Sequence, residues 1–191
     1  MTATVLRIPP AVNFTSEQFY DLCRINPNWK LEREATGDLV IMSPTGGETG
    51  ARNADILIQL GLWNQRKSQG IVFDSSTGFH LPNGADRSPD VAWVKKERWQ
   101  GLSLLEREKF PPLAPDFVIE LMSPTDNLSD AQTKMIEYQQ NGVKMGWLIN
   151  RRLQQVEIYQ LGKEREVLTK PKSLSGDPIL VDFRLNLTNF W

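Results

Sequence analysis

Hydrophobic and polar residues alternate along this chain with two different periods, and each period predicts one type of element. Ile56, Leu60 and Trp63 recur at steps of four and three, and Leu57 lies beside them. Residues at these steps share one face of an α-helix, which has about 3.6 residues per turn. The pattern therefore predicts an amphipathic helix whose apolar face is turned toward the core.

The clearest helix start in the sequence lies at Ser129. Its hydroxyl can cap the helix, and Gln132 can reach back to the backbone N–H of the cap residue. Gly142 suits the left-handed conformation that ends many helices. We therefore expect a helix that begins at Ser129 and runs to Asn141.

A smaller unit is predicted near the start of the chain. The segment from Thr15 to Cys23 fits a short helix capped by Thr15 or Ser16. The turn Thr36-Gly37-Asp38 then separates two strand-like segments, which predicts a β-hairpin. The two hairpin strands are Trp29–Arg33 and Leu39–Met42.

Strand-like segments fill the middle of the chain. Three of them are separated by turn signals such as Asn83-Gly84, and we expect these three to form a meander. The segment Phe117–Leu121 is apolar on both faces apart from Glu120, which is typical of a central strand covered on both sides. The predicted strands are Ile71–Phe73, Gly78–Leu81, Val91–Val94, Phe117–Leu121, Trp147–Ile149 and Val156–Tyr159.

Helices that interleave with such strands indicate the fold class. We expect an α/β or α+β core, with a mixed central sheet flanked by helices. The chain has 191 residues, of which 40% are hydrophobic, so it is long enough to bury one substantial core. We predict a single domain over residues 1–191, with the helix and hairpin at about residues 15–43 preceding the core.

Composition narrows the chemistry. Cys23 is the only cysteine and His80 the only histidine, which excludes intrachain disulfides, thiolate zinc sites and the familiar catalytic triads with a spare histidine. Any metal ion must then be held by oxygen. The net charge of −1 means that contact with nucleic acid requires a local basic patch, such as Arg151-Arg152. The sequence has neither a signal-peptide layout nor a long uncharged apolar run, and we expect a soluble cytoplasmic protein with no membrane contact.

Two acidic residues interrupt apolar surroundings. Asp90 opens the strand Val91–Val94, and Glu120 lies inside the most apolar strand. Neighbouring strands lie about 4.8 Å apart, so carboxylates at adjacent positions of two strands can share one small cation, Mg²⁺ or Mn²⁺. The alternatives are that Asp90 caps a turn and that Glu120 pairs with a core lysine or arginine. Asp116 lies about 13 Å along the strand from Glu120, so we interpret it as a strand-entry residue.

Hydrolysis of a phosphodiester also requires a group that positions water and offsets charge on the phosphate. Lys134 lies in the first turns of the helix after the Glu120 strand, with Tyr138 near its face at helical spacing. It can reach the two acids or lie solvated on the outer face, and spacing alone leaves both open. Glu48 is either a further ligand or a carboxylate placed at a helix N-terminus.

Four segments, in this order, resemble the Uma-two family of putative endonucleases, a branch of the PD-(D/E)XK nuclease superfamily. The similarity extends from about Trp29 to Tyr159. The segments are Ser88–Ala92, Pro115–Pro124, Lys134–Tyr138 and Gly142–Ile149.

The resemblance implies a restriction-endonuclease-like core, a Mg²⁺-dependent site that cleaves nucleic acid, DNA above all, and a homodimer. Asp90 matches the Pro-Asp acid of the superfamily and Glu120 its second acid. The superfamily pattern expects lysine two residues after that acid, where this chain has Met122. Lys134 on the following helix is the matching position.

The leading hypothesis is a metal-dependent endonuclease. In it, Asp90 and Glu120 hold Mg²⁺ or Mn²⁺ and Lys134 positions or activates water, with Glu48 and Tyr138 as possible additional residues. One alternative is an inactive binding module with a nuclease fold, which Met122 and the near-neutral charge favour. Another is a small-molecule metallo-hydrolase with a narrower pocket.

Overall fold

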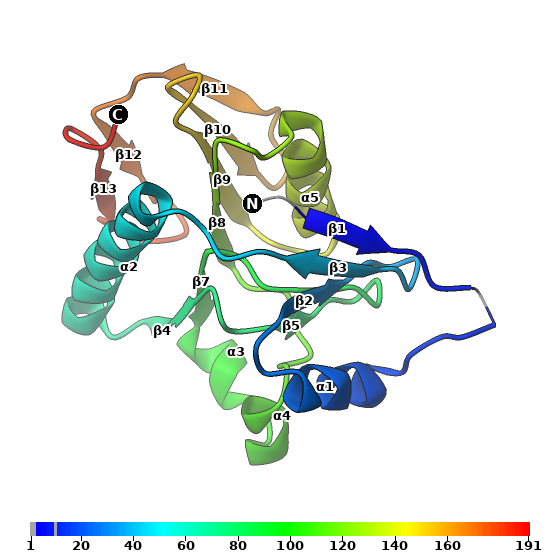
Figure 1. Cartoon of the computed structure of the whole chain (residues 1–191). Helices are drawn as coiled ribbons and strands as arrows, with labels where there is room; N and C mark the ends of the chain where they lie inside the picture. The colour runs from blue at the N-terminus through cyan, green and yellow to red at the C-terminus, as the bar shows by residue number, and fades with distance from the viewer. Residues whose placement is uncertain (1–2, 10) are drawn as a thin grey trace.

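The computed structural model describes residues 3–9 and 11–191, and in this part of the chain the main sheet has six strands. Its strand order is β11-β10-β9-β8-β7-β4 (Figure 1). Strand β8 pairs in parallel with β9 and antiparallel with β7, so the sheet is mixed and β8 lies inside it, as predicted. The strands are β4 (Gly70–Asp74), β7 (Val91–Lys95), β8 (Phe117–Met122), β9 (Met145–Asn150), β10 (Gln155–Gln160) and β11 (Glu166–Thr169).

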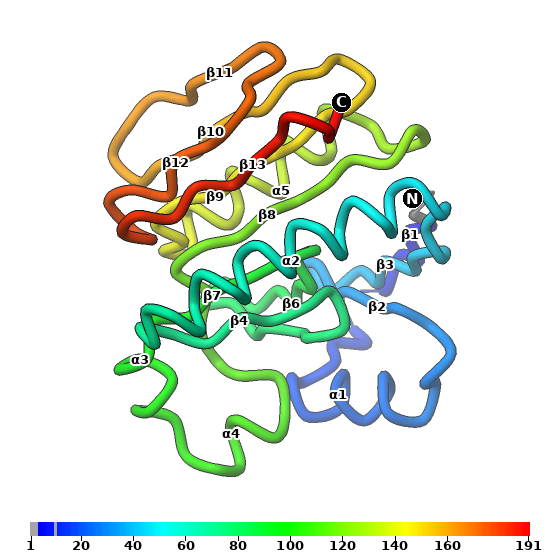
Figure 2. The backbone as a smooth tube through the Cα atoms, turned by 90° about the vertical axis from the view of Figure 1, so that its left-hand side faces the viewer, coloured from blue at the N-terminus to red at the C-terminus, as the bar shows by residue number. Residues whose placement is uncertain are grey.

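Helices cover both faces of this sheet. Figure 2 shows α2 (Gly47–Lys67) on one side of β8 and α5 (Leu128–Gln140) on the other. The predicted apolar face of α2 is buried, because its side chains share a core with one set of strand residues. That core includes Ile56, Leu60, Trp63, Val91, Trp93, Phe117 and Ile119.

The opposite face of the sheet packs against α5. Met135 and Tyr138 of the helix share a core with Ala92, Val118 and Leu148 from three neighbouring strands. Because strand side chains alternate between faces, even-numbered residues of β7 and β8 point toward α5. The helix is therefore placed over the strand that carries Glu120.

The start of α5 differs from the prediction, and the residue after its end agrees with it. The cap is Asn127, not Ser129, since the Asn127 side-chain oxygen accepts a hydrogen bond from the Ser129 N–H at 2.8 Å. Gln132 does not reach back to the cap but donates to Glu157 at 2.8 Å. Gly142 follows the helix with φ of +96°, which confirms its predicted left-handed role.

A second sheet is built around the N-terminal hairpin. Its order is β1-β3-β2-β6-β5 in the described residues, and α1 (Ser16–Ile25), capped by Thr15, packs beside β2. The predicted helix and hairpin are thus both present. The strands are β1 (Ala3–Leu6), β2 (Lys30–Arg33), β3 (Leu39–Met42), β5 (Phe79–His80) and β6 (Asp86–Arg87).

The predicted meander of three middle strands is wrong. Strand β4 pairs directly with β7 along its whole length, and β5 leaves to pair with β6 in the other sheet. The Asp74 carboxylate accepts the Ser76 N–H at 3.1 Å and forms a turn there that redirects the chain. Turn residues show that the chain reverses, but they do not say which sheet receives the next strand.

The remaining elements are short. Helices α3 (Lys96–Gln100) and α4 (Leu104–Glu108) connect β7 to β8, and β12 (Ser173–Ser175) pairs with β13 (Arg184–Asn186). Leu174 and Leu185 of this pair join the core beneath α2. Of the helices in the described residues, none is both long and apolar enough to cross a membrane.

Candidate active site

Asp90 directly precedes β7, and the pairing of β7 with β8 sets it beside Glu120. Val91 pairs with Ile119 in the antiparallel register of β7 and β8, and one further step along this register sets Asp90 beside Glu120. Side chains opposite each other in such a pair have Cβ atoms about 5 Å apart and point to the same face. Asp90 Oδ2 also accepts the Leu121 N–H at 2.8 Å, so the carboxylate is held against β8.

Lys134 reaches this pair from α5. Its ammonium lies 3.0 Å from Glu120 Oε1, and only 19% of the side chain is exposed. The alternative of a solvated outer lysine is therefore excluded. Tyr138, one turn further along the helix, donates its hydroxyl hydrogen bond to the same Glu120 oxygen at 2.9 Å.

A further carboxylate, which the sequence patterns did not single out, belongs to the same cluster. Glu32 on β2 is 2% exposed, and its Oε1 lies 2.9 Å from the Lys134 ammonium. In the sequence, Glu32 alternates with Leu31 as any solvent-facing hairpin residue would. No local signal marked it, because its burial depends on the packing of the second sheet against α5.

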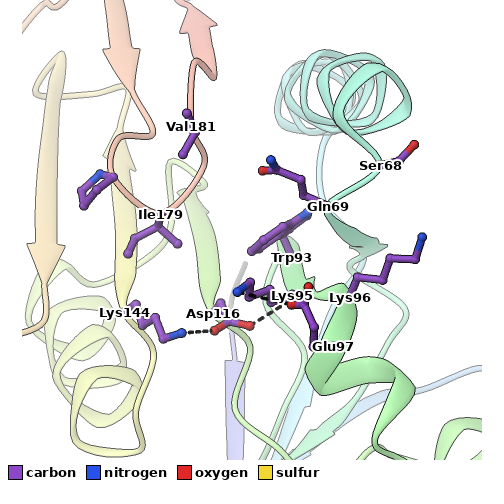
Figure 3. Close-up of a pocket in the computed structure, with 11 residues that line it drawn as sticks. Ser68, Gln69, Trp93, Lys95, Lys96, Glu97, Asp116, Lys144, Ile179 and Val181 are labelled. Carbon is purple, nitrogen blue, oxygen red and sulfur yellow. Dashed lines mark hydrogen bonds and ion pairs between the residues drawn. The ribbon is translucent and has the colours of Figure 1, made fainter.

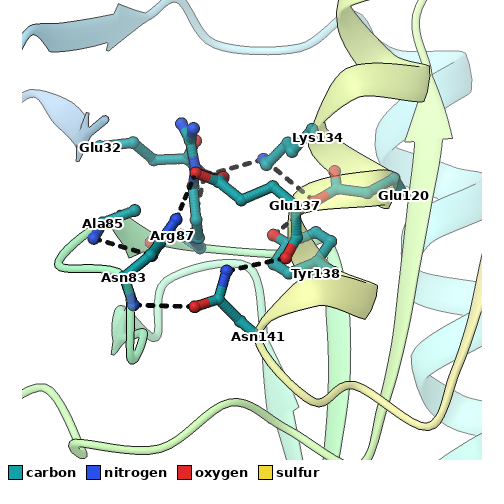
Figure 4. Close-up of polar contacts among 10 residues, drawn as sticks. Glu32, Asn83, Ala85, Arg87, Glu120, Lys134, Glu137, Tyr138 and Asn141 are labelled. Carbon is teal, nitrogen blue, oxygen red and sulfur yellow. Dashed lines mark hydrogen bonds and ion pairs between the residues drawn. The ribbon is translucent and has the colours of Figure 1, made fainter. Parts of the chain in front are cut away.

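Arginine and asparagine side chains extend the cluster outward (Figure 4). Arg87 lies between two acids, with Nη1 3.3 Å from Glu32 and Nε 2.6 Å from Glu137. Glu137 also accepts a hydrogen bond from Asn83 at 3.0 Å. In the described part of this cluster, the carboxylates of Glu32, Glu120 and Glu137 pair with the two cations Lys134 and Arg87, and Asp90 beside Glu120 is the fourth carboxylate.

The protonation of these groups follows from their surroundings. Burial raises the pKa of Glu120, and the neighbouring charges of Asp90 and Glu32 add to the rise against the opposing effect of Lys134. Burial alone would raise the pKa of Glu32 too, but Lys134 and Arg87 outweigh it and the pKa is lowered. Glu32, which has Arg87 and the Ser88 N–H as partners in addition to Lys134, is therefore ionised more readily than Glu120.

The lysine and tyrosine keep their protons. Burial alone would lower the pKa of Lys134, but Glu120 and Glu32 outweigh it and the pKa lies above its usual range. Burial and the same two carboxylates hold the pKa of Tyr138 well above its ordinary value. At neutral pH both side chains are therefore hydrogen-bond donors, and neither can accept a proton.

Carboxylate oxygens such as those of Asp90 and Glu120 are the type of ligand that Mg²⁺ prefers. Among the described residues, Asp90 Oδ1 and Glu120 Oε2 have no hydrogen-bond or ion-pair partner and remain available as ligands. No group of three or more His, Cys, Asp or Glu side chains in residues 3–9 and 11–191 is arranged to hold a metal ion. Mg²⁺ commonly keeps several waters and uses one or two carboxylates, so two acids are a sufficient protein contribution.

Met122 occupies the position at which the superfamily pattern has lysine. Its side chain is 6% exposed and packs in the core beneath α5 together with Met135. Met122 points to the same face of β8 as Glu120, because the two residues are two positions apart. The Lys134 ammonium reaches Glu120 from the helix above this face.

Glu48 lies in the first turn of α2 and is exposed. Its carboxylate pairs with Arg151 at 3.3 Å and with Arg52 at 3.7 Å. Arg151 follows β9 directly, and the last residue of β9, Asn150, pairs with Met122. Glu48 thus contacts a residue near the Met122 end of β8, and none of its ion pairs in the described residues involves Asp90, Glu120 or Lys134.

Asp116 has a structural role at the other end of β8, as its interpretation as a strand-entry residue predicted. It is 1% exposed, accepts the Lys95 N–H at 2.8 Å and pairs with Arg98 at 3.0 Å and Lys144 at 2.8 Å. A pocket of about 510 Å³ opens beside it, with Trp93 and Ile179 in its walls (Figure 3). Two lysines that line this pocket already form ion pairs, Lys144 with Asp116 and Lys95 with Glu97.

His80 lies on β5 in contact with a serine and an aspartate. Its Nδ1 lies 3.0 Å from Asp86 Oδ1, and the Ser16 hydroxyl lies 3.0 Å from Nε2 and 3.3 Å from Nδ1. A hydroxyl that is nearly equidistant from both ring nitrogens does not lie along either lone pair, so this is not the geometry of a serine nucleophile and its base. Asp86 is also paired with Arg33 at 2.7 Å, and the group ties α1 to the second sheet.

Comparisons with known proteins agree with this fold. A family model described as "Uma2: Putative restriction endonuclease" matches residues 16–188. A crystal structure described as a putative nuclease belonging to DUF820 from Anabaena variabilis ATCC 29413 superimposes with a TM-score of 0.76 at 20% identity. The alignment covers 92% of this chain and 96% of that one. No curated protein matches in sequence.

Proposed function

The chain belongs to the Uma2 family of putative restriction endonucleases, and we propose from this premise that it is a metal-dependent endonuclease that hydrolyses phosphodiester bonds of DNA. The observation that carries the proposal is the convergence of three side chains from three elements. The register of β7 and β8, extended by one residue, sets Asp90 beside Glu120, and the Lys134 ammonium lies 3.0 Å from Glu120. Paired acids that can hold a metal ion, with one cation beside them, are a combination that supports phosphodiester hydrolysis.

The proposed roles follow from charge. Asp90 and Glu120 would hold Mg²⁺ or Mn²⁺, which when bound supplies Lewis acidity toward the phosphate and lowers the pKa of bound water. Lys134 is charged at neutral pH, so it can donate hydrogen bonds to the attacking water or to a phosphate oxygen but cannot remove a proton. Tyr138 donates to Glu120 and orients its carboxylate.

The reaction is a displacement at phosphorus. The water oxygen forms a bond to phosphorus as the bond from phosphorus to the leaving oxygen breaks, and water supplies the proton that the leaving oxygen takes up. Negative charge grows on the phosphate oxygens during this step, and the Lys134 ammonium offsets it. Burial of Lys134 strengthens this interaction, because the charge is only partly screened by solvent.

The cluster carries more negative than positive charge. With every group ionised, its four carboxylates exceed its two cations by two charges. That excess matches one divalent cation and repels a phosphate backbone while no cation is bound. The charge balance therefore supports a requirement for metal.

The test is cleavage of supercoiled and linear DNA with Mg²⁺ or Mn²⁺, and with EDTA. Asp90→Asn and Glu120→Gln should abolish cleavage and weaken Mn²⁺ binding measured by calorimetry. Asp130→Asn is the matched control, because it removes an exposed acid in the first turn of α5 and should leave both readouts near wild type. Cleavage that survives in both site variants would defeat the assignment.

Substrate and assembly complete the proposal. An RNA substrate in the same assay separates DNA from RNA cleavage. Arg151, which follows the β9 residue paired with Met122, is a candidate for a phosphate contact. We also propose that the protein is a homodimer, whose mass light scattering measures, and that it is cytoplasmic. If the protein binds Mn²⁺ and DNA but does not cleave, the alternative of an inactive binding module, favoured by Met122 in the lysine position, replaces the nuclease.

A further inference from the structure

Glu32 contacts three separate parts of the candidate active site. Its Oε1 lies 2.9 Å from the Lys134 ammonium and accepts the Ser88 N–H at 2.8 Å, and its Oε2 lies 3.3 Å from Arg87. Ser88 begins the short segment that leads to Asp90. The Glu32 carboxylate on the N-terminal hairpin is thus bonded both to α5, through Lys134, and to the segment Ser88–Asp90.

Packing of the hairpin does not require a charge at this position. A buried carboxylate loses its hydration, and a nonpolar residue of similar size commonly fills such a position at equal or better stability. Glu32 is 2% exposed, yet both of its oxygens are matched by donors from other elements. Such a fully matched buried acid indicates a role in orienting its partners.

The partner most affected is Lys134. Its ammonium is nearly equidistant from two acids, 2.9 Å from Glu32 and 3.0 Å from Glu120. A cation held by Glu120 would repel the ammonium and weaken its contact with that acid. Glu32 would then be the carboxylate that keeps the ammonium beside the phosphate.

We propose that Glu32 is a positioning residue that holds the Lys134 ammonium and the Ser88–Asp90 segment in place for hydrolysis. The inference rests on the proposed function and deepens it, since it makes the N-terminal hairpin part of the active site. As a positioning residue, Glu32 touches neither the substrate nor the metal. Its effect passes through Lys134 and through Ser88.

The central variant is Glu32→Gln, which keeps the shape of the side chain and removes its charge. We expect kcat to fall by about 10- to 100-fold, as for other residues that orient catalytic groups, with KM changed by less than about twofold. Glu157→Gln is the matched control. It removes the charge of another buried glutamate, which pairs with Arg165 at 3.1 Å but touches neither Lys134 nor Ser88 in the described contacts, and it should stay near wild type.

A second readout does not depend on turnover. Without Glu32, the ammonium pairs with Glu120 alone and competes more strongly with a cation for that acid. Glu32→Gln should therefore weaken Mn²⁺ binding by about tenfold in calorimetry. In a Lys134→Met background, where this competition is absent, Glu32→Gln should change Mn²⁺ binding by less than about twofold, because the two residues act as one unit.

The outcomes separate this inference from the proposed function. If wild type cleaves DNA and Glu32→Gln behaves like Glu157→Gln, or if the loss of Mn²⁺ binding persists in full in the Lys134→Met background, the positioning role is wrong while the nuclease proposal stands. If wild type binds Mn²⁺ without cleaving, the proposed nuclease function is wrong. The Mn²⁺ affinities of Glu32→Gln in the wild-type and Lys134→Met backgrounds then test by themselves whether Glu32 positions Lys134. If wild type neither cleaves nor binds Mn²⁺, both fall. Should Glu32→Gln fail to fold, Glu32→Asp, which keeps the charge but withdraws it by one methylene, takes its place under the same criteria.

Discussion

The Lys134 ammonium lies 3.0 Å from the Glu120 carboxylate, and the two residues come from the helix and the strand on either side of one connection. The helix begins soon after β8 ends and packs back across the face on which Glu120 lies. This contact supplies a cation to the paired acids even though Met122 occupies the expected lysine position. Its consequences can be measured one residue at a time.

Replacement of Lys134 by methionine should remove most of the cleavage activity. We expect a loss of about 10²- to 10³-fold in kcat, the range seen when one charge-stabilising donor is removed. Lys163→Met, at an exposed position, is the control for loss of a positive charge. An active Lys134→Met protein would show that the ammonium has no part in the reaction.

Glu120→Gln should make the folded protein more stable at neutral and alkaline pH, although it removes a proposed ligand. Burial raises the pKa of Glu120, so its contribution to stability is present below the ordinary pKa of 4.5 and is lost as pH rises through the higher folded value. Glutamine cannot ionise and avoids this loss. We expect a gain of about 1 kcal/mol, or about 2–4 °C in Tm, at pH 8.

The same comparison at acid pH is the check on its cause. Thermal melts of wild type and Glu120→Gln, without added metal, should converge as pH falls toward 4.5. A Tm difference that does not depend on pH would mean that packing, and not the charge of Glu120, sets the stability.

Removal of the Tyr138 hydroxyl should have a smaller effect than removal of the Lys134 charge. The hydroxyl orients Glu120 through one hydrogen bond of 2.9 Å, and such a bond is worth about 1.4 kcal/mol. We therefore expect Tyr138→Phe to lose about tenfold in kcat. Tyr20→Phe, whose hydroxyl donates to the Glu108 carbonyl at the surface, should keep its activity. An equal loss in both variants would point to a general change in folding.

Asp116 follows Pro115 as Asp90 follows Pro89, and Asp116→Asn tests whether its role is structural and separate from that of Asp90. Asp116 is buried among Arg98, Lys144 and the Lys95 N–H, but both cations are more than a third exposed, so we expect a loss of only about 2 kcal/mol. The pKa of Asp116 is lowered: burial opposes the shift, but Lys144 and the other partners outweigh it. The stabilisation is therefore present above the ordinary pKa of 3.8 and is lost in acid.

Urea unfolding at pH 7 and at pH 3 measures this loss, and it should shrink at the lower pH. Mn²⁺ binding of Asp116→Asn at pH 7 should equal that of wild type, in contrast to Asp90→Asn. Weakened Mn²⁺ binding in a folded Asp116→Asn protein would mean that this end of β8 also takes part in the metal site.

The sequence by itself determined the longer helices, most strands of the main sheet and the polar residues that interrupt them. The spacing of Ile56, Leu60 and Trp63 predicted α2, and the apolar surroundings of Glu120 predicted an interior strand. These features are readable because helix and strand periods are local properties of the chain. The proximity of Asp90 and Glu120 was also accessible, as soon as their strands were taken to be neighbours.

Only the tertiary structure decided which distant segments meet. It turned Lys134 inward, brought Glu32 from the N-terminal hairpin to the same ammonium and sent β5 to a different sheet from β4. The burial of Glu32 and the pairing of β5 depend on contacts between segments far apart in the chain, which neither residue type nor local period specifies. A carboxylate on a short hairpin strand looks the same in sequence whether solvent or a buried lysine covers it.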